Sequence, residues 1–117
     1  MRSFFKSFKF AIKGITLALT QRNFKIMVTT AILAVFLGFL FHITVAEWCI
    51  LVICIGLVLA LEIINTAIEA FVDLVQPEFH PVAGKIKDLA AAAVLIFSVV
   101  AFACGVLIFW KYVLALL

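Results

Sequence analysis

Acidic side chains recur at helical spacing within a segment that is otherwise apolar. Glu62, Asn65, Glu69 and Asp73 are separated by three or four residues, so a helix presents them as one stripe along a single face. On membrane-insertion scales an acid near a helix centre costs about 2.5 to 3.5 kcal/mol, whereas each Leu, Ile or Val contributes only about 0.3 to 0.6 kcal/mol. The stripe must therefore face protein, water or a ligand.

The depth of this stripe indicates what chemistry it could perform. At about 1.5 Å per residue, Glu62 lies roughly 16 Å along the helix from Asp73. With Asp73 at the membrane surface, the stripe runs from water into the upper acyl region, where a lipid hydroxyl could meet a water-soluble cosubstrate. Two other interpretations remain open: the polar residues could join helices by hydrogen bonds, or line a polar pore in an oligomer.

The composition indicates which elements position the stripe. The chain has 117 residues, of which 68% are hydrophobic and 13% charged, so we expect a single all-α domain over residues 1–117, integral to a membrane. Membrane helices are expected over 24–43, 46–75 and 85–112, each meeting the requirement of roughly 20 residues. Within residues 1–21 the basic residues recur every three or four positions, and the phenylalanines occupy other faces, which predicts an amphipathic helix at the membrane interface.

The distribution of positive charge predicts the orientation. Basic residues cluster before the first span, and the loop between the first two spans has none. The positive-inside rule therefore places the N-terminus and the loop around residues 76–88 in the cytoplasm. Because topology accounts for these residues, the net charge of +3 does not indicate a nucleic-acid partner.

The sequence contains neither a GxxxxGK[ST] loop nor a GxGxxG run. A nucleotide would therefore bind without the usual phosphate cradles, and carboxylates that hold a divalent ion against its phosphates would contribute more. Lys85 and Lys87, at the expected start of the last helix, could bring charge to phosphate or could simply anchor the topology.

Several motifs together resemble one family. The run Glu62 to Glu69, the pair Val72-Asp73, the triplet Glu78 to His80 and the run Ala83 to Leu95 closely resemble the prokaryotic diacylglycerol kinases, which include the undecaprenol kinases. The resemblance covers nearly the whole chain. It implies an ATP-dependent lipid kinase of the bacterial inner membrane, assembled as a homotrimer with active sites shared between subunits. The acceptor would be diacylglycerol or undecaprenol.

The resemblance also implies roles for individual residues. Glu62 would be the general base on the lipid hydroxyl, and Asn65 would orient the reacting groups. Glu69 would bind ATP together with the Mg²⁺ that bridges its phosphates. The remaining implied ATP-binding residues are Glu78, Phe79 and His80 in the loop, and Lys87 and Asp88 on the last helix.

Two positions depart from the family pattern. Many members have a second metal carboxylate where this chain has Gln21, and Phe10 stands where some relatives place an aromatic residue against the adenine. We therefore expect a metal site with a single carboxylate. The alternative function is a small oligomeric transporter or channel with an acid-lined path. Against it stand the run Leu89 to Trp110 of the last span, which has no charged residue, and the crowding of polar groups toward one surface. A purely structural membrane protein would tolerate substitution of Glu62 and Glu69.

Overall fold

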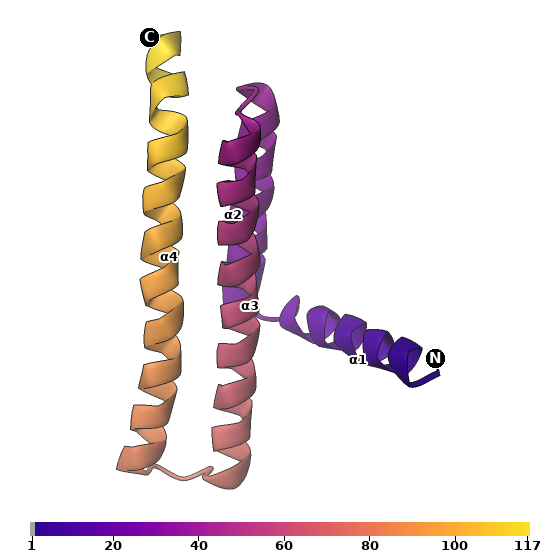
Figure 1. The fold of residues 1–117 in the computed structure, drawn as a ribbon. Coiled ribbons are helices and arrows are strands. Elements are labelled where there is room, and N and C mark those ends of the chain that lie inside the picture. The colour runs from indigo at the N-terminus through magenta and orange to yellow at the C-terminus, as the bar shows by residue number, and fades with distance from the viewer. Residues whose placement is uncertain (1) are drawn as a thin grey trace.

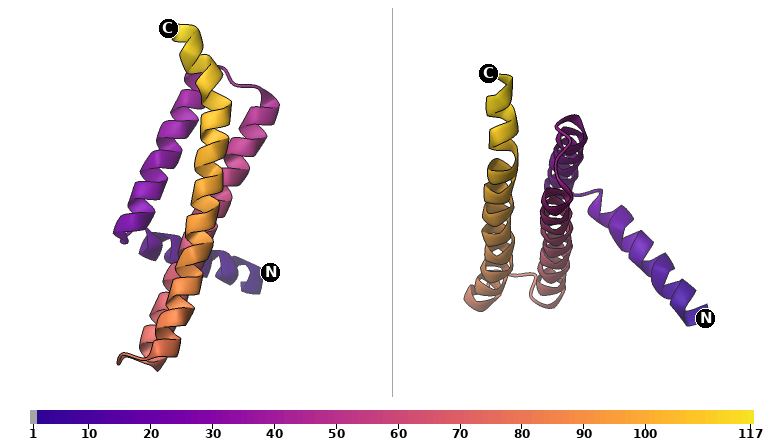
Figure 2. Two further views of the ribbon diagram at one scale, coloured as in Figure 1. Left: turned by 90° about the vertical axis from the view of Figure 1, so that its left-hand side faces the viewer. Right: turned by 45° about the horizontal axis from the view of Figure 1, so that its top comes forward.

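The computed structural model describes residues 2–117, which form four α-helices. They are α1 (Arg2–Ala18), α2 (Arg22–Leu40), α3 (Val45–Val75) and α4 (Pro81–Leu116). Helices α2, α3 and α4 run side by side, whereas α1 projects away from them (Figures 1 and 2). These three helices are long and apolar enough to cross a membrane, which confirms an all-helical chain with three candidate spans.

Helices α3 and α4 form an antiparallel pair that extends over nearly their whole length (Figure 1). We call the end of the bundle where α2 connects to α3 the His42 end, and the end where α3 connects to α4 the Gln76 end. An ion pair joins Glu47 to Lys111 at the His42 end, and another joins Asp73 to Lys87 at the Gln76 end. The two acids are almost as far apart along α3 as the two lysines are along α4, so the two helices keep one register throughout.

The first membrane helix ends earlier than the expected segment 24–43. His42 adopts a φ of 52°, a left-handed conformation that His tolerates better than most residues. The Ile43 amide donates to the Gly38 carbonyl at 3.2 Å, and the His42 amide donates to the Phe39 carbonyl at 3.4 Å. This Schellman pattern satisfies the last carbonyls of α2 and turns the chain toward α3. The helix therefore stops at Leu40.

The chain buries a small apolar core close to this turn. Ile43, Leu51 and Ile108 are buried there, and Trp48 packs against them. A methyl group at Gly38 would lie 2.6 Å from a ring carbon of Trp48, so only glycine lets α2 approach α3 this closely. The core thus holds all three long helices together at the His42 end.

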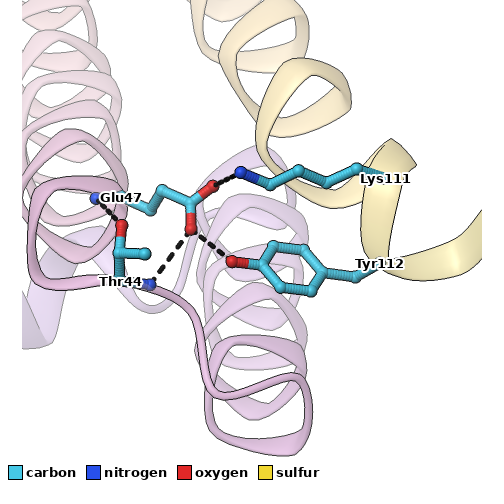
Figure 3. Close-up of polar contacts among 4 residues, drawn as sticks. All are labelled: Thr44, Glu47, Lys111 and Tyr112. Atoms are coloured by element: carbon cyan, nitrogen blue, oxygen red, sulfur yellow. Dashed lines mark hydrogen bonds and ion pairs between the residues drawn. The ribbon is translucent and has the colours of Figure 1, made fainter. Parts of the chain in front are cut away.

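A polar cluster lies beside this core, and we call it the Glu47 clasp (Figure 3). Thr44 and Glu47 form a capping box, in which the Glu47 amide donates to the Thr44 hydroxyl at 3.2 Å and the Glu47 carboxylate accepts from the Thr44 amide at 3.0 Å. The same carboxylate accepts from the Tyr112 hydroxyl and pairs with the Lys111 ammonium at 2.9 Å. Glu47 therefore caps α3 and ties it to α4.

Helix α1 joins α2 beside the middle of α3 (Figure 1). Its last residue, Ala18, is buried, and α1 contacts α3. Its phenylalanines are exposed, including Phe4, Phe5 and Phe8. On a helix these three residues fall on a different face from Lys6 and Lys9, so α1 is amphipathic. Its placement at a membrane interface stays a prediction.

We predict that Gly38→Ala lowers the thermal unfolding midpoint in detergent micelles, because the new methyl group displaces Trp48. Overpacking a core typically lowers the free energy of unfolding by about 1 to 3 kcal/mol. Gly56→Ala is the matched control, since no atom lies within 4 Å of the added methyl group there and alanine favours helix. Equal midpoints for the two variants would contradict the packing at Gly38.

We predict that Tyr112→Phe destabilises the protein by about 1 to 3 kcal/mol, because a buried carboxylate loses one hydrogen bond. A double-mutant cycle with Glu47→Gln, measured as the free energy of unfolding in mixed micelles, should reveal coupling between the two positions. Additive losses would show that the hydroxyl and the carboxylate do not interact.

Candidate functional site

The acidic stripe passes from buried to exposed along α3. Glu62 and Asn65 are buried, with 6% and 8% of their surface exposed, whereas Glu69 is exposed. The Asn65 amide nitrogen donates to the Glu69 carboxylate at 3.3 Å, so these two side chains lie on one face, as their spacing predicts. Glu62 follows one turn further from the Gln76 end.

Asn65 has one amide atom with no partner. Because a carboxylate only accepts hydrogen bonds, Asn65 must direct its nitrogen toward Glu69, which leaves its carbonyl oxygen on the other side. That oxygen is buried and has no hydrogen bond within residues 2–117. A buried acceptor without a donor costs roughly 1 to 3 kcal/mol and calls for an explanation. A substrate hydroxyl or a water molecule could supply the missing donor.

Helix α4 brings a cation to the stripe. The Lys87 ammonium pairs with the Asp73 carboxylate, which lies one helical turn beyond Glu69. Lys87 and Glu69 are therefore at the same end of the bundle, as a shared nucleotide site requires. Sequence reasoning included Asp73 in the stripe but missed its partner, since the register of α3 against α4 cannot be read from either segment alone.

The connection at the Gln76 end carries the remaining expected ligands. Glu78 and Phe79 are exposed, and 93% of the Phe79 surface is accessible. His80 caps α4, because its ring Nδ1 accepts from the Val82 amide at 3.1 Å. With Pro81 in the first turn, this cap starts the helix before the expected segment 85–112 begins.

The site residues thus form a gradient from the Gln76 end inward. The connection and Lys87 are exposed or half-buried, Glu69 follows, and Asn65 and Glu62 are buried. Such an arrangement could hold a charged, soluble molecule at its outer part and an apolar alcohol at its inner part. Asp88 follows Lys87 in the chain and is exposed.

An apolar groove begins about one turn from Glu62. It has a volume of about 750 Å³ and is lined by all three long helices, with Val58 and Leu59 near the stripe and Val113 and Leu114 at its other extreme. The lining is almost entirely apolar, so the groove suits hydrocarbon.

No cluster of three or more His, Cys, Asp or Glu side chains that could hold a metal ion occurs within residues 2–117. A cation bound by one of these carboxylates would complete its coordination with other oxygen ligands. Mg²⁺ commonly does so, because it keeps several waters and combines one or two carboxylates with substrate phosphates. Glu69, exposed and bonded to Asn65, fits that requirement.

Comparison with known proteins decides which class of protein this is. Residues 9–109 match the family model of prokaryotic diacylglycerol kinase. The chain belongs to this family. It is therefore a lipid kinase, which confirms the expectation from its motifs and argues against the acid-lined channel.

Individual relatives agree with this assignment. An undecaprenol kinase of Bacillus subtilis is 43% identical over 110 residues, which cover 93% of this chain and 89% of that protein. A diacylglycerol kinase of Helicobacter pylori is 35% identical over 118 residues, covering 96% of this chain and 85% of the relative. A Synechocystis diacylglycerol kinase is 38% identical over 101 residues, covering 85% of this chain and 58% of the relative.

We predict that Asn65→Leu raises the thermal unfolding midpoint, because it removes a buried carbonyl that has no partner. The free energy of unfolding should rise by about 1 kcal/mol, because removing the unpartnered carbonyl stabilises the fold by more than the lost hydrogen bond to Glu69 costs. Thr66→Val is the matched control, since the Thr66 hydroxyl already donates to the Glu62 carbonyl at 2.9 Å. A clear loss of stability in Asn65→Leu would show that the amide contributes mainly to structure.

Proposed function

We propose that this protein transfers the γ-phosphate of ATP to the hydroxyl of a membrane lipid alcohol. The observation that carries the proposal is the unpartnered carbonyl of Asn65, buried between Glu62 and the exposed Glu69. A phosphoryl transfer needs positioning and charge neutralisation more than covalent chemistry. The Asn65 carbonyl can accept a hydrogen bond from a hydroxyl, and the nearby Glu69 carboxylate could face phosphate.

In this proposal each stripe residue has one task. The acceptor hydroxyl donates a hydrogen bond to the Asn65 carbonyl, which orients it. The hydroxyl then turns its one proton from Asn65 to Glu62, which accepts it as the oxygen bonds to the γ-phosphorus. The bond from that phosphorus to the bridging oxygen of the β-phosphate breaks, and ADP leaves. Its burial excludes water, so a lipid alcohol reaches the base more readily than a competing water does.

Glu69 would hold Mg²⁺ together with the ATP phosphates, and the ion would neutralise charge on the transferred group. Gln21 does not provide a second carboxylate, and its side-chain nitrogen lies 3.5 Å from the Thr20 hydroxyl. The proposed site therefore depends on a single acid. We expect weaker metal affinity than in a two-carboxylate site, because ligand charge sets affinity.

ATP would lie at the Gln76 end. Lys87 contacts its phosphates in this proposal, while Asp88, Glu78 and His80 contact the rest of the nucleotide. The exposed ring of Phe79 provides a flat apolar surface for the base. Phe10, on α1, is also exposed, but only the family resemblance connects it with adenine.

The lengths of the helices support this division between water and lipid. Helix α4 has 36 residues and thus extends about 54 Å, well beyond a hydrocarbon core of about 30 Å. Helix α1 joins the bundle beside the middle of α3 (Figure 1). When α1 is placed in the headgroup layer, as the proposal requires, the Gln76 end extends into water. The proposal places that end and the N-terminus in the cytoplasm, with the protein in the bacterial inner membrane.

Two lipid acceptors are candidates. The Bacillus subtilis undecaprenol kinase shares 43% identity with this chain, more than the two diacylglycerol kinases compared above. We therefore propose undecaprenol as the preferred acceptor, giving undecaprenyl phosphate. Diacylglycerol, giving phosphatidic acid, is the second candidate. The apolar groove offers either tail a surface close to Glu62.

Assembly as a homotrimer also belongs to the proposal. Ala91, Ala92 and Ala93 are exposed on α4, and small residues allow another helix to approach closely. The mass of the detergent-solubilised protein, corrected for bound detergent, tests this; a monomer would contradict it.

The deciding assay supplies labelled ATP and Mg²⁺ with undecaprenol or diacylglycerol in mixed micelles. We expect labelled undecaprenyl phosphate to form faster than labelled phosphatidic acid, and no product when a chelator removes the metal. Absence of any labelled lipid in either arm would refute the proposed function.

We predict that Glu62→Gln lowers kcat by at least about 10²-fold, the usual contribution of a general base, while nucleotide binding stays nearly unchanged. Glu47→Gln is the matched control, because it makes the same substitution in another buried acid on α3, at the far end of the helix. It should keep its activity at temperatures where it is folded. An active Glu62→Gln variant would exclude Glu62 as the base.

A further inference from the structure

The ammonium of Lys87 already has an anionic partner within the chain. It pairs with Asp73, and the two side chains are 37% and 61% exposed. The other ion pair within residues 2–117, between Lys111 and Glu47, lies at the opposite end of the bundle. The charge that the proposed function assigns to phosphate is therefore neutralised by a carboxylate on α3.

Asp73 lies close to where the phosphates would be. It follows Glu69 by four residues on α3, so the two carboxylates share a face and are separated by about 6 Å along the helix axis. A lysine carries its charge on a flexible four-carbon stem. The Lys87 ammonium can therefore shift from Asp73 toward a phosphate beside Glu69 by side-chain rotation, without movement of α4.

We propose that Asp73 is an internal counter-ion that competes with the nucleotide phosphates for Lys87 and thereby weakens ATP binding. The proposal rests on the proposed function, because it takes Lys87 as the phosphate contact. An exposed ion pair contributes little to free energy, so the competition changes affinity by about two- to fivefold. Asp73 is thus an affinity-setting residue and takes no part in the chemical step.

The opposite role for Asp73 is also physically reasonable and predicts the opposite sign. If Asp73 positioned Lys87 for the phosphates, removing its charge would loosen the ammonium and weaken binding. If Asp73 competes, removing its charge frees the ammonium and strengthens binding. The direction of the change in affinity therefore separates the two roles.

The experiment uses Asp73→Asn, which removes the charge and keeps the shape. Binding of a non-hydrolysable ATP analogue with Mg²⁺ is measured by calorimetry in micelles, and KM for ATP and kcat are measured with the lipid acceptor. We expect Kd and KM to fall two- to fivefold with kcat unchanged, and the difference from the wild type to shrink at 1 M salt, because screening weakens the pair. An unchanged or raised Kd would overturn the proposal.

Two further variants make the result specific. Asp73→Glu keeps the charge and should bind nucleotide like the wild type. The Lys87→Met variant should itself bind nucleotide more weakly. In that background Asp73→Asn should lose most of its effect on nucleotide affinity, because the ammonium for which Asp73 and the phosphates compete is gone. A full effect in that background would show that Asp73 acts by general repulsion of the phosphates and would also overturn the proposal.

Failure of this inference is distinguishable from failure of the proposed function. If the proposed function is wrong, the wild-type protein binds no nucleotide and phosphorylates neither lipid. If only the counter-ion proposal is wrong, the wild type is an active kinase and the Asp73→Asn variant binds nucleotide no more tightly than the wild type. Asp73 is exposed, so the variant should fold, and its unfolding midpoint checks this.

Discussion

The antiparallel register of α3 and α4 is the constraint on which the other features depend. Lys111 and Lys87 of α4 each pair with an acid of α3, one at either end of the two helices. A slip by one residue would turn the facing side chains to another part of each helix surface and separate both pairs. The register therefore decides that a cation of α4 arrives within one turn of Glu69.

The two buried acids of α3 differ in how far the chain itself uses their hydrogen-bonding capacity. Glu47 caps its helix, accepts from Tyr112 and pairs with Lys111, so its hydrogen-bonding capacity is used within the chain. At Glu62 it is the backbone carbonyl, and not the side chain, that accepts a hydrogen bond from the Thr66 hydroxyl. The first acid thus stabilises the fold, whereas the second is the acid to which the proposed function assigns the role of base.

Local features of this protein were predictable from the sequence, and contacts between helices were not. The spacing of Asn65 and Glu69 predicted their shared face because both lie on one helix, and hydropathy located the three long helices. The end of α2 depends on the left-handed backbone of His42, which has no strong sequence signal. The start of α4 depends on its His80 cap, and Pro81 after it is a known signal of a helix start that the expected segment 85–112 did not take into account. The partners of Lys87 and Lys111 depend on tertiary register.

The Glu47 clasp also changes the charge that the His42 end presents to its surroundings. Lys111 is the only basic residue after Asp88, and it lies at the opposite end from the Lys87 cation. Its partner Glu47 contributes an opposite charge at that same end, so the clasp adds no net charge there. The pairing therefore leaves the His42 end of residues 2–117 without an unpaired lysine or arginine in the folded protein.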